Sequence, residues 1–166
     1  YNTAIGMNAM FTNTTGNNNT AVDGKALEDN TTGNYNTAVG GNALSSNTTA
    51  NHNTAIGYYA MAVNTTGGEN VAVGNFALDA SNSTGNTALG RSALTALTTG
   101  SYNVAVGRYA LSSQTTASDN VAIGHLALAA NTTGTDNVAV GANALDANIS
   151  ASDNTAIGDN ALGANT

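Results

Sequence analysis

Residues 154–162 read Asn-Thr-Ala-Ile-Gly-Asp-Asn-Ala-Leu, and close copies of this stretch fill the chain. Successive copies begin 17 residues apart, except that the step from Asn70 to Asn86 is 16 residues. The full repeat reads N-T/V-A-I/V-G-x-x-A-L-x-x-N-T-T-G-x-x, and we number its positions as columns 1 to 17. The asparagines of column 1 mark the ten starts: Asn2, Asn19, Asn36, Asn53, Asn70, Asn86, Asn103, Asn120, Asn137 and Asn154.

A unit of 17 residues is too short to bury a core of its own, whereas stacked units bury one between neighbours. Columns 2 to 4 alternate with the period of two that is typical of a strand. Glycine in column 5 and Asn-Thr-Thr-Gly in columns 12 to 15 indicate turns. Asp23, which replaces the glycine once, tolerates the left-handed backbone region better than most residues. We therefore predict an all-β, parallel β-solenoid (β-roll) of about ten coils, a single repeat array over residues 1–166. Each coil would hold two short strands, one on Asn-Thr-Ala-Ile-Gly and one centred on Ala-Leu.

The side chains of the repeat can be assigned to an inside and an outside. We expect the column 1 asparagines to stack as a ladder that bridges backbone groups of adjacent coils. Columns 2, 4 and 9 carry the large apolar residues and are expected to fill the interior. The invariant alanines of column 3 then lie on the opposite face and indicate close packing there. They are Ala4, Ala21, Ala38, Ala55, Ala72, Ala88, Ala105, Ala122, Ala139 and Ala156.

Two explanations account for the invariant alanines. A neighbouring chain of a homotrimer packs against them, or they occupy a tight spot inside a single coil. The first is favoured, because the expected interior is thin and the chain has no cysteine to staple it.

The composition excludes several classes of protein. Of 166 residues, 5% are aromatic and 8% are charged, and the net charge of −7 argues against a nucleic-acid partner, which needs a basic surface. No apolar run approaches the ~20 residues of a membrane span. The two histidines, His52 and His125, have no acid or nucleophile at a supporting spacing. We therefore predict no enzymatic activity, no cofactor, and no nucleic-acid or membrane partner.

The motif Asn-Thr-Ala-Ile-Gly-x-x-Ala-Leu, as at residues 154–162, resembles the repeats of two related groups of proteins. One is the head repeat of YadA-like trimeric autotransporter adhesins, whose Ser-Val-Ala-Ile-Gly-x-x-Ala coils are a few residues shorter. The other is the array of tail-fibre-like proteins that often precedes an endosialidase-type chaperone domain, and it is closer because it shares Asn-Thr-Thr-Gly. The resemblance implies a trimeric, parallel β-roll that serves as an extracellular fibre or adhesive surface, without catalysis.

These observations favour a structural segment of an extracellular, cell-surface or virion-surface fibre. The chain begins and ends inside a repeat, without a capping unit, so we expect it to belong to a longer fibre. An alternative is a filament subunit that polymerises end to end. A third hypothesis is ice binding by stacked threonine pairs in columns 13 and 14, although adjacent residues of a strand point to opposite faces.

The variable columns hold three groups of candidate binding residues. Aromatic residues in columns 6 and 7 could contact a surface glycan or receptor, or they could cover a coil edge or an inter-chain seam: they are Tyr58, Tyr59, Phe76 and Tyr109. A small basic stripe in column 6 is most simply solvated surface: it consists of Arg91, Arg108 and His125. Carboxylates in column 17 are weak candidates for a hard cation such as Ca²⁺, or they cap turns: they are Asp119, Asp136 and Asp153.

The Asn-Thr-Thr segments match the acceptor pattern of N-glycosylation, although asparagine and threonine also suit tight turns. The candidate acceptors are Asn13, Asn30, Asn47, Asn64 and Asn131.

Overall fold

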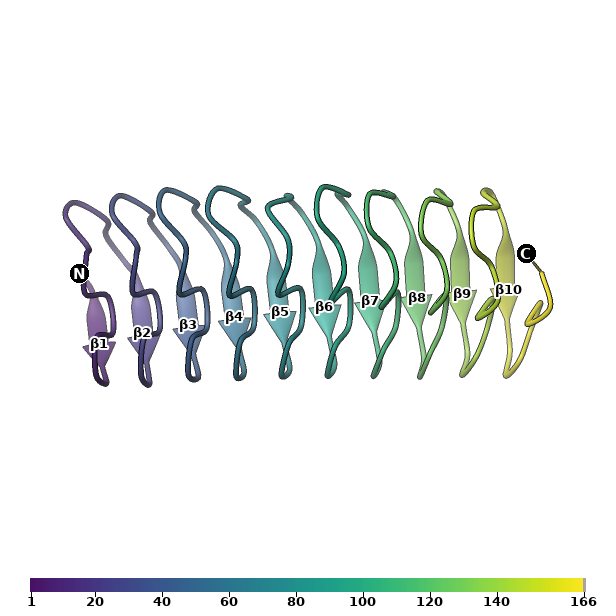
Figure 1. Cartoon of the computed structure of the whole chain (residues 1–166), viewed down its shortest axis with the longest axis horizontal. Helices are drawn as coiled ribbons and strands as arrows, with labels where there is room; N and C mark the ends of the chain where they lie inside the picture. The colour runs from purple at the N-terminus through teal and green to yellow at the C-terminus, as the bar shows by residue number, and fades with distance from the viewer. Residues whose placement is uncertain (166) are drawn as a thin grey trace.

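The computed structural model describes residues 1–165, which form one all-β solenoid with a three-residue strand in each coil (Figure 1). The strands are β1 (Thr3–Ile5), β2 (Thr20–Val22), β3 (Thr37–Val39), β4 (Thr54–Ile56), β5 (Val71–Val73), β6 (Thr87–Leu89), β7 (Val104–Val106), β8 (Val121–Ile123), β9 (Val138–Val140) and β10 (Thr155–Ile157). They pair in sequence order as one parallel, ten-stranded sheet. The predicted all-β, parallel solenoid is therefore confirmed.

The sheet keeps each column in register with itself. Ala38 of β3 pairs with Ala21 on one side and Ala55 on the other, so every strand meets an identical position of its neighbours. The short coil does not disturb this register, because Ala72 of β5 still pairs with Ala88 of β6. The residue missing from the short coil falls in its wide loop.

The strands turn their alanine inward. In β2, Ala21 is fully buried, whereas Thr20 and Val22 on either side of it are only half-buried. The alanines share one apolar cluster with the column 9 residues, such as the fully buried Leu27 and Leu44. The prediction for column 9 is confirmed, but the prediction that columns 2 and 4 fill the interior is wrong. The strand contributes a methyl group to the core and a leucine or methionine enters from the other side of the coil.

The invariant alanines consequently lie inside a single coil, which is the second of the two explanations. They offer no surface to a neighbouring chain, since none of those in the covered coils is more than 3% exposed: Ala21, Ala38, Ala55, Ala72, Ala88, Ala105, Ala122, Ala139 and Ala156. Ala4 is exposed, because the first coil has no coil beneath it.

The segment around Ala-Leu folds as consecutive turns, so the second predicted strand is absent from the described coils. Columns 7 and 9 both have left-handed backbone angles, with φ of 63° at Lys25 and 53° at Leu27. A residue with positive φ cannot continue an extended strand. Hydrogen bonds still join the coils here, since the N–H of Leu27 donates to the carbonyl oxygen of Ala43 at 3.0 Å.

Two rows of polar side chains run through the interior: column 1 is asparagine in every coil, and column 12 is asparagine except at Ser81, Leu97 and Gln114. In column 1, the N–H of Asn36 donates to Oδ1 of Asn19 at 2.8 Å, and Nδ2 of Asn36 donates to the carbonyl oxygen of Ala50 at 2.8 Å. In column 12, Nδ2 of Asn47 donates to Oδ1 of Asn30 at 2.7 Å and to the same Ala50 oxygen at 3.3 Å. No buried side-chain nitrogen or oxygen of residues 1–165 lacks a partner, so these polar rows are fully satisfied.

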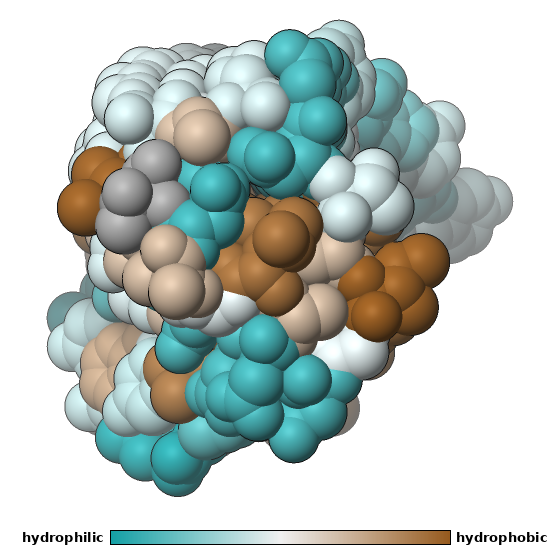
Figure 2. Space-filling model, turned by 90° about the vertical axis from the view of Figure 1, so that its right-hand side faces the viewer, coloured by the Kyte–Doolittle hydropathy of each residue, from teal (hydrophilic) through white to brown (hydrophobic). Residues whose placement is uncertain are grey.

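Figure 2 looks along the solenoid onto its C-terminal coil, where apolar residues lie at the centre of the face and hydrophilic residues gather above and below them. The cross-section is therefore a thin apolar centre with a polar boundary, repeated along the length of the molecule.

Candidate binding surfaces

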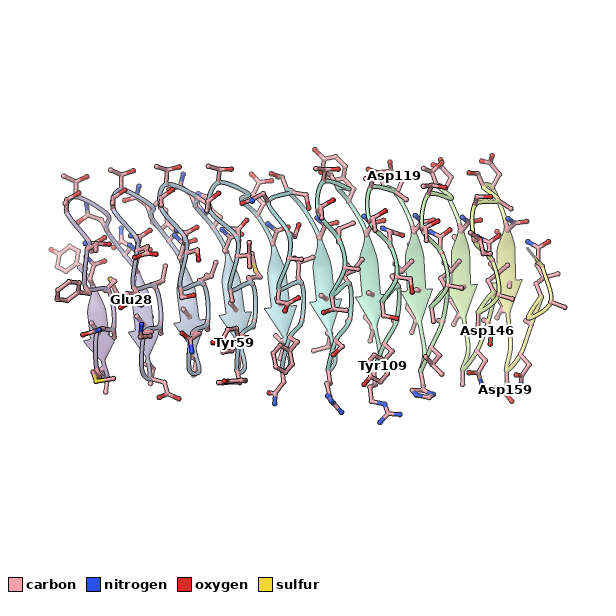
Figure 3. All side chains as sticks on the ribbon, in the orientation of Figure 1. Glu28, Tyr59, Tyr109, Asp119, Asp146 and Asp159 are labelled. Carbon is pink, nitrogen blue, oxygen red and sulfur yellow. The ribbon has the colours of Figure 1, made fainter. Side chains whose placement is uncertain are left out.

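The narrow edge of the solenoid is the tight turn of columns 6 and 7, which follows each strand. Figure 3 shows Tyr59 and Tyr109 on this edge, and Asp119 on the opposite, wide edge. The narrow turn reverses the chain because column 5 has φ near 135° in most coils and column 7 is left-handed. Asp23 takes the column 5 conformation with φ of 98°, as its tolerance of that region predicted.

Three aromatic side chains form a cluster on the narrow edge. Tyr58 packs edge-on against Tyr59, with ring centroids 4.6 Å apart, and against Phe76 of the next coil, with centroids 5.8 Å apart. Tyr59 stacks on Phe76 at 5.9 Å. Tyr58 and Tyr59 remain 49% and 36% exposed, so the cluster presents rings to solvent while its members hold one another in place.

The basic residues continue the same edge in the following coils. The guanidinium groups of Arg91 and Arg108 lie 5.8 and 5.1 Å from the centroid of the Tyr109 ring, which is the range of cation–π contacts. Nη2 of Arg108 is also 3.2 Å from Nε2 of His125. Because an arginine can only donate, Nε2 of His125 is the acceptor if this contact is a hydrogen bond. The aromatic residues and the basic stripe are thus neighbours on one surface.

The carboxylates of column 17 lie on the wide edge, where Asp119, Asp136 and Asp153 are exposed and have φ between 57° and 61°. Across residues 1–165, no group of three or more histidine, cysteine, aspartate or glutamate side chains is arranged to hold a metal ion. The three aspartates lie in separate turns with similar left-handed backbone angles.

The candidate glycosylation sites are inside the solenoid. Asn30, Asn47, Asn64 and Asn131 are fully buried, and each donates its Nδ2 to a carbonyl oxygen three residues later. Asn13 in the first coil is half-buried and makes the same bond to Gly16. The prediction is wrong for the folded chain, since a sugar on Nδ2 would replace a buried hydrogen bond.

Of the two threonine rows, the column 13 row uses its hydroxyl groups within the solenoid. Oγ1 of Thr31 donates to the carbonyl oxygen of Thr48 at 2.9 Å, and Oγ1 of Thr48 donates to that of Thr65 at 3.1 Å. These residues lie in bends and not in a flat strand. The row is therefore a structural seam between coils.

The outer face of the sheet carries no charged side chain along its whole length. Column 4 is valine, isoleucine or leucine in all ten coils, whereas column 2 is threonine in six coils and valine in four. Ile56, Val71, Leu89 and Ile123 are 40 to 45% exposed although they belong to central coils. The alanines inside the coil do not contribute to this face.

Two other titratable residues, His52 and Asp79, belong to neither surface. His52 stacks on Tyr35, with ring centroids 4.9 Å apart. Burial raises the pKa of Asp79 above its usual value, although Oγ1 of Thr95 donates to the carboxylate at 3.0 Å and opposes the shift. Residues 1–165 enclose no pocket. None of their segments forms a helix with the length and hydrophobicity needed to cross a membrane.

Comparison with known proteins leaves the fold and the surfaces as the basis for assigning a role, because no protein-family model, curated protein or solved structure matches this chain.

Proposed function

We propose that this chain is a rigid structural segment of an extracellular or virion-surface fibre, in which copies pack side by side through the outer face of the sheet. The observation that carries the proposal is the uncharged outer face of columns 2 and 4, on which column 4 is apolar in every coil. Solvent-facing positions repeated over ten coils normally acquire charged residues, yet these positions hold none. Parallel sheets are almost always covered on both faces, and contiguous exposed apolar patches mark interaction sites.

The mechanism of such a segment is mechanical. Each coil donates backbone hydrogen bonds to its neighbours from the strand, the turns and the wide loop, so the rod resists bending and stretching. With ~4.8 Å between paired strands, ten coils give a rod of roughly 50 Å. No catalytic step is proposed, and the resemblance to trimeric fibre repeats makes three copies the expected number.

Light scattering combined with negative-stain imaging tests the proposal. A mass near three times 16.4 kDa, with short rods, is the expected result. Ile123→Glu places a charge on the sheet face and is expected to yield monomers. Val63→Glu, at an apolar residue outside columns 2 and 4 that is also exposed, is expected to leave the mass unchanged. A wild-type monomer would overturn side-by-side packing. Long filaments would favour end-to-end polymerisation instead.

Ice binding through the threonine pairs receives little support from the geometry, because the pairs lie in bends and the column 13 hydroxyl groups, as at Thr31 and Thr48, already donate to backbone carbonyls.

A further inference from the structure

The narrow edge concentrates the positive charge of an acidic chain. The chain has three lysine and arginine residues against ten aspartate and glutamate residues, and two of those three cations are Arg91 and Arg108. In the five consecutive coils from Tyr58 to Leu126, columns 6 and 7 hold no acidic residue. We define these ten positions as the narrow-edge stripe: Tyr58, Tyr59, Asn75, Phe76, Arg91, Ser92, Arg108, Tyr109, His125 and Leu126.

The two arginines have no carboxylate partner within the described part of the chain. The one ion pair among residues 1–165 joins Lys25 to Glu28, outside the stripe. Arg91 and Arg108 instead flank the same Tyr109 ring, so two like charges are held close together by one aromatic side chain. An anion that contacts both guanidinium groups would relieve this repulsion, and guanidinium is well suited to bind carboxylate in a bidentate manner.

The arrangement of the stripe indicates a long ligand. Its first half is the aromatic cluster of Tyr58, Tyr59 and Phe76, and its second half is the cationic group around Tyr109. Four steps of ~4.8 Å separate its first and last coils, so the stripe is roughly 19 Å long. Pyranose rings of an extended polysaccharide repeat at a spacing close to that of the coils, and their apolar faces pack on exposed aromatic rings.

We propose that the narrow-edge stripe binds an acidic polysaccharide that lies along the solenoid, with carboxylates on Arg91 and Arg108 and sugar rings on Tyr58, Tyr59 and Phe76. A carboxylated glycan fits better than a nucleic acid. DNA presents one phosphate per ~1.7 Å of duplex, a charge density that two arginines on a chain of net charge −7 do not match. This binding does not depend on side-by-side packing of the sheet face.

The experiment measures binding of the wild-type chain to polygalacturonate by titration calorimetry, at low and at physiological ionic strength (~0.15 M). Saturable binding that weakens with salt is expected, and fully methyl-esterified polygalacturonate, which lacks the charge, is expected to bind at least about tenfold more weakly. Absence of binding by the wild-type chain would overturn the proposal. Tighter binding of oligo(dT) than of polygalacturonate would also overturn it, in favour of a single-stranded nucleic acid.

Variants locate the site. The double variant Arg91→Gln/Arg108→Gln is expected to lose most of the binding, and Phe76→Asn is expected to weaken it, since asparagine already occupies column 7 in other coils. Lys25→Gln removes the third cation from the same edge but outside the stripe, and it should leave binding unchanged. Equal losses in Lys25→Gln and the double variant would show a non-specific charge effect and reject the site. Circular dichroism and mass of each variant separate loss of binding from loss of folding or assembly.

Discussion

The N–H of Asn53 donates to Oδ1 of Asn36 at 3.0 Å, across one full coil. The Asn36 side chain therefore joins two coils at once, because its Nδ2 also donates to the carbonyl oxygen of Ala50 at 2.8 Å. Both partners are buried backbone groups that have no access to water. The asparagine side chain serves as the hydrogen-bond partner of backbone groups where the chain enters each strand. This role explains why column 1 is asparagine in every coil.

Asn36→Ala is expected to destabilise the solenoid by about 2–4 kcal/mol, because it leaves the N–H of Asn53 and the carbonyl of Ala50 without this partner. Urea unfolding followed by circular dichroism measures the loss. Asn75→Ala is the control, since Asn75 is exposed on the narrow edge and its removal should change stability by less than about 0.5 kcal/mol. Equal effects of the two changes would show that the ladder contributes nothing beyond an ordinary surface residue.

Gly57→Ala is expected to be strongly destabilising, by about 2 kcal/mol or more, for two reasons. Gly57 has φ of 135°, and an added Cβ would lie 2.7 Å from the carbonyl carbon and oxygen of Gly74 in the next coil. Gly41→Ala is the matched change, because its Cβ would meet only the Tyr58 ring at 3.4 Å. Thermal unfolding of both variants tests the prediction, and a tolerated Gly57→Ala would contradict the close stacking of the column 5 turns.

Lys25 occupies column 7 with φ of 63°, a conformation that costs alanine more than asparagine. Lys25→Asn is therefore expected to be more stable than Lys25→Ala by about 0.5–1 kcal/mol. Both changes remove the same exposed ion pair with Glu28, so the comparison isolates the backbone effect. If chemical denaturation gives the same midpoint for the two variants, the left-handed angle does not control stability here.

Stability is expected to depend on pH through Asp79. Burial raises the pKa of its carboxyl group above the usual 3.8. The folded chain therefore binds this proton more tightly than the unfolded chain does. The contribution of this residue to stability is full below pH 3.8 and is lost as pH rises through the folded-state pKa. Asp79→Asn, which keeps an oxygen for the Thr95 hydroxyl, should stabilise the chain more at neutral pH than in acid. An equal effect at both pH values in urea titrations would refute this origin.

The periodicity of the sequence was sufficient to predict the parallel solenoid, because identical coils stacked in sequence order bring each column beside itself, as Ala38 and Ala55 show. The sequence did not reveal the width of the interior. Size alone places Val22 inside and Ala21 outside, and the structure has the reverse. The signals for the correct assignment were the invariance of column 3 and the threonine that occupies column 2 in six of the ten coils.

Two further features could be recognised only in the folded structure. Leucine has no preference for positive φ, so nothing in the residue type at Leu27 indicates a left-handed turn. The segment Asn47-Thr48-Thr49 is consistent with a turn and with a glycan acceptor. Only the full burial of Asn47 identifies it as a polar residue of the core. Sequence analysis treated the aromatic and the basic residues of the narrow edge as separate groups. Their proximity depends on columns 6 and 7 sharing one turn, which places Arg108 over Tyr109.

The unbroken register across the short coil, where Ala72 still pairs with Ala88, bears on how such an array evolves. A coil meets the same partners whichever copies precede and follow it, so duplication or deletion of one unit by unequal recombination yields another folded rod. The length of the rod is then inherited and changes by one coil at a time, independently of the side chains on the narrow and wide edges.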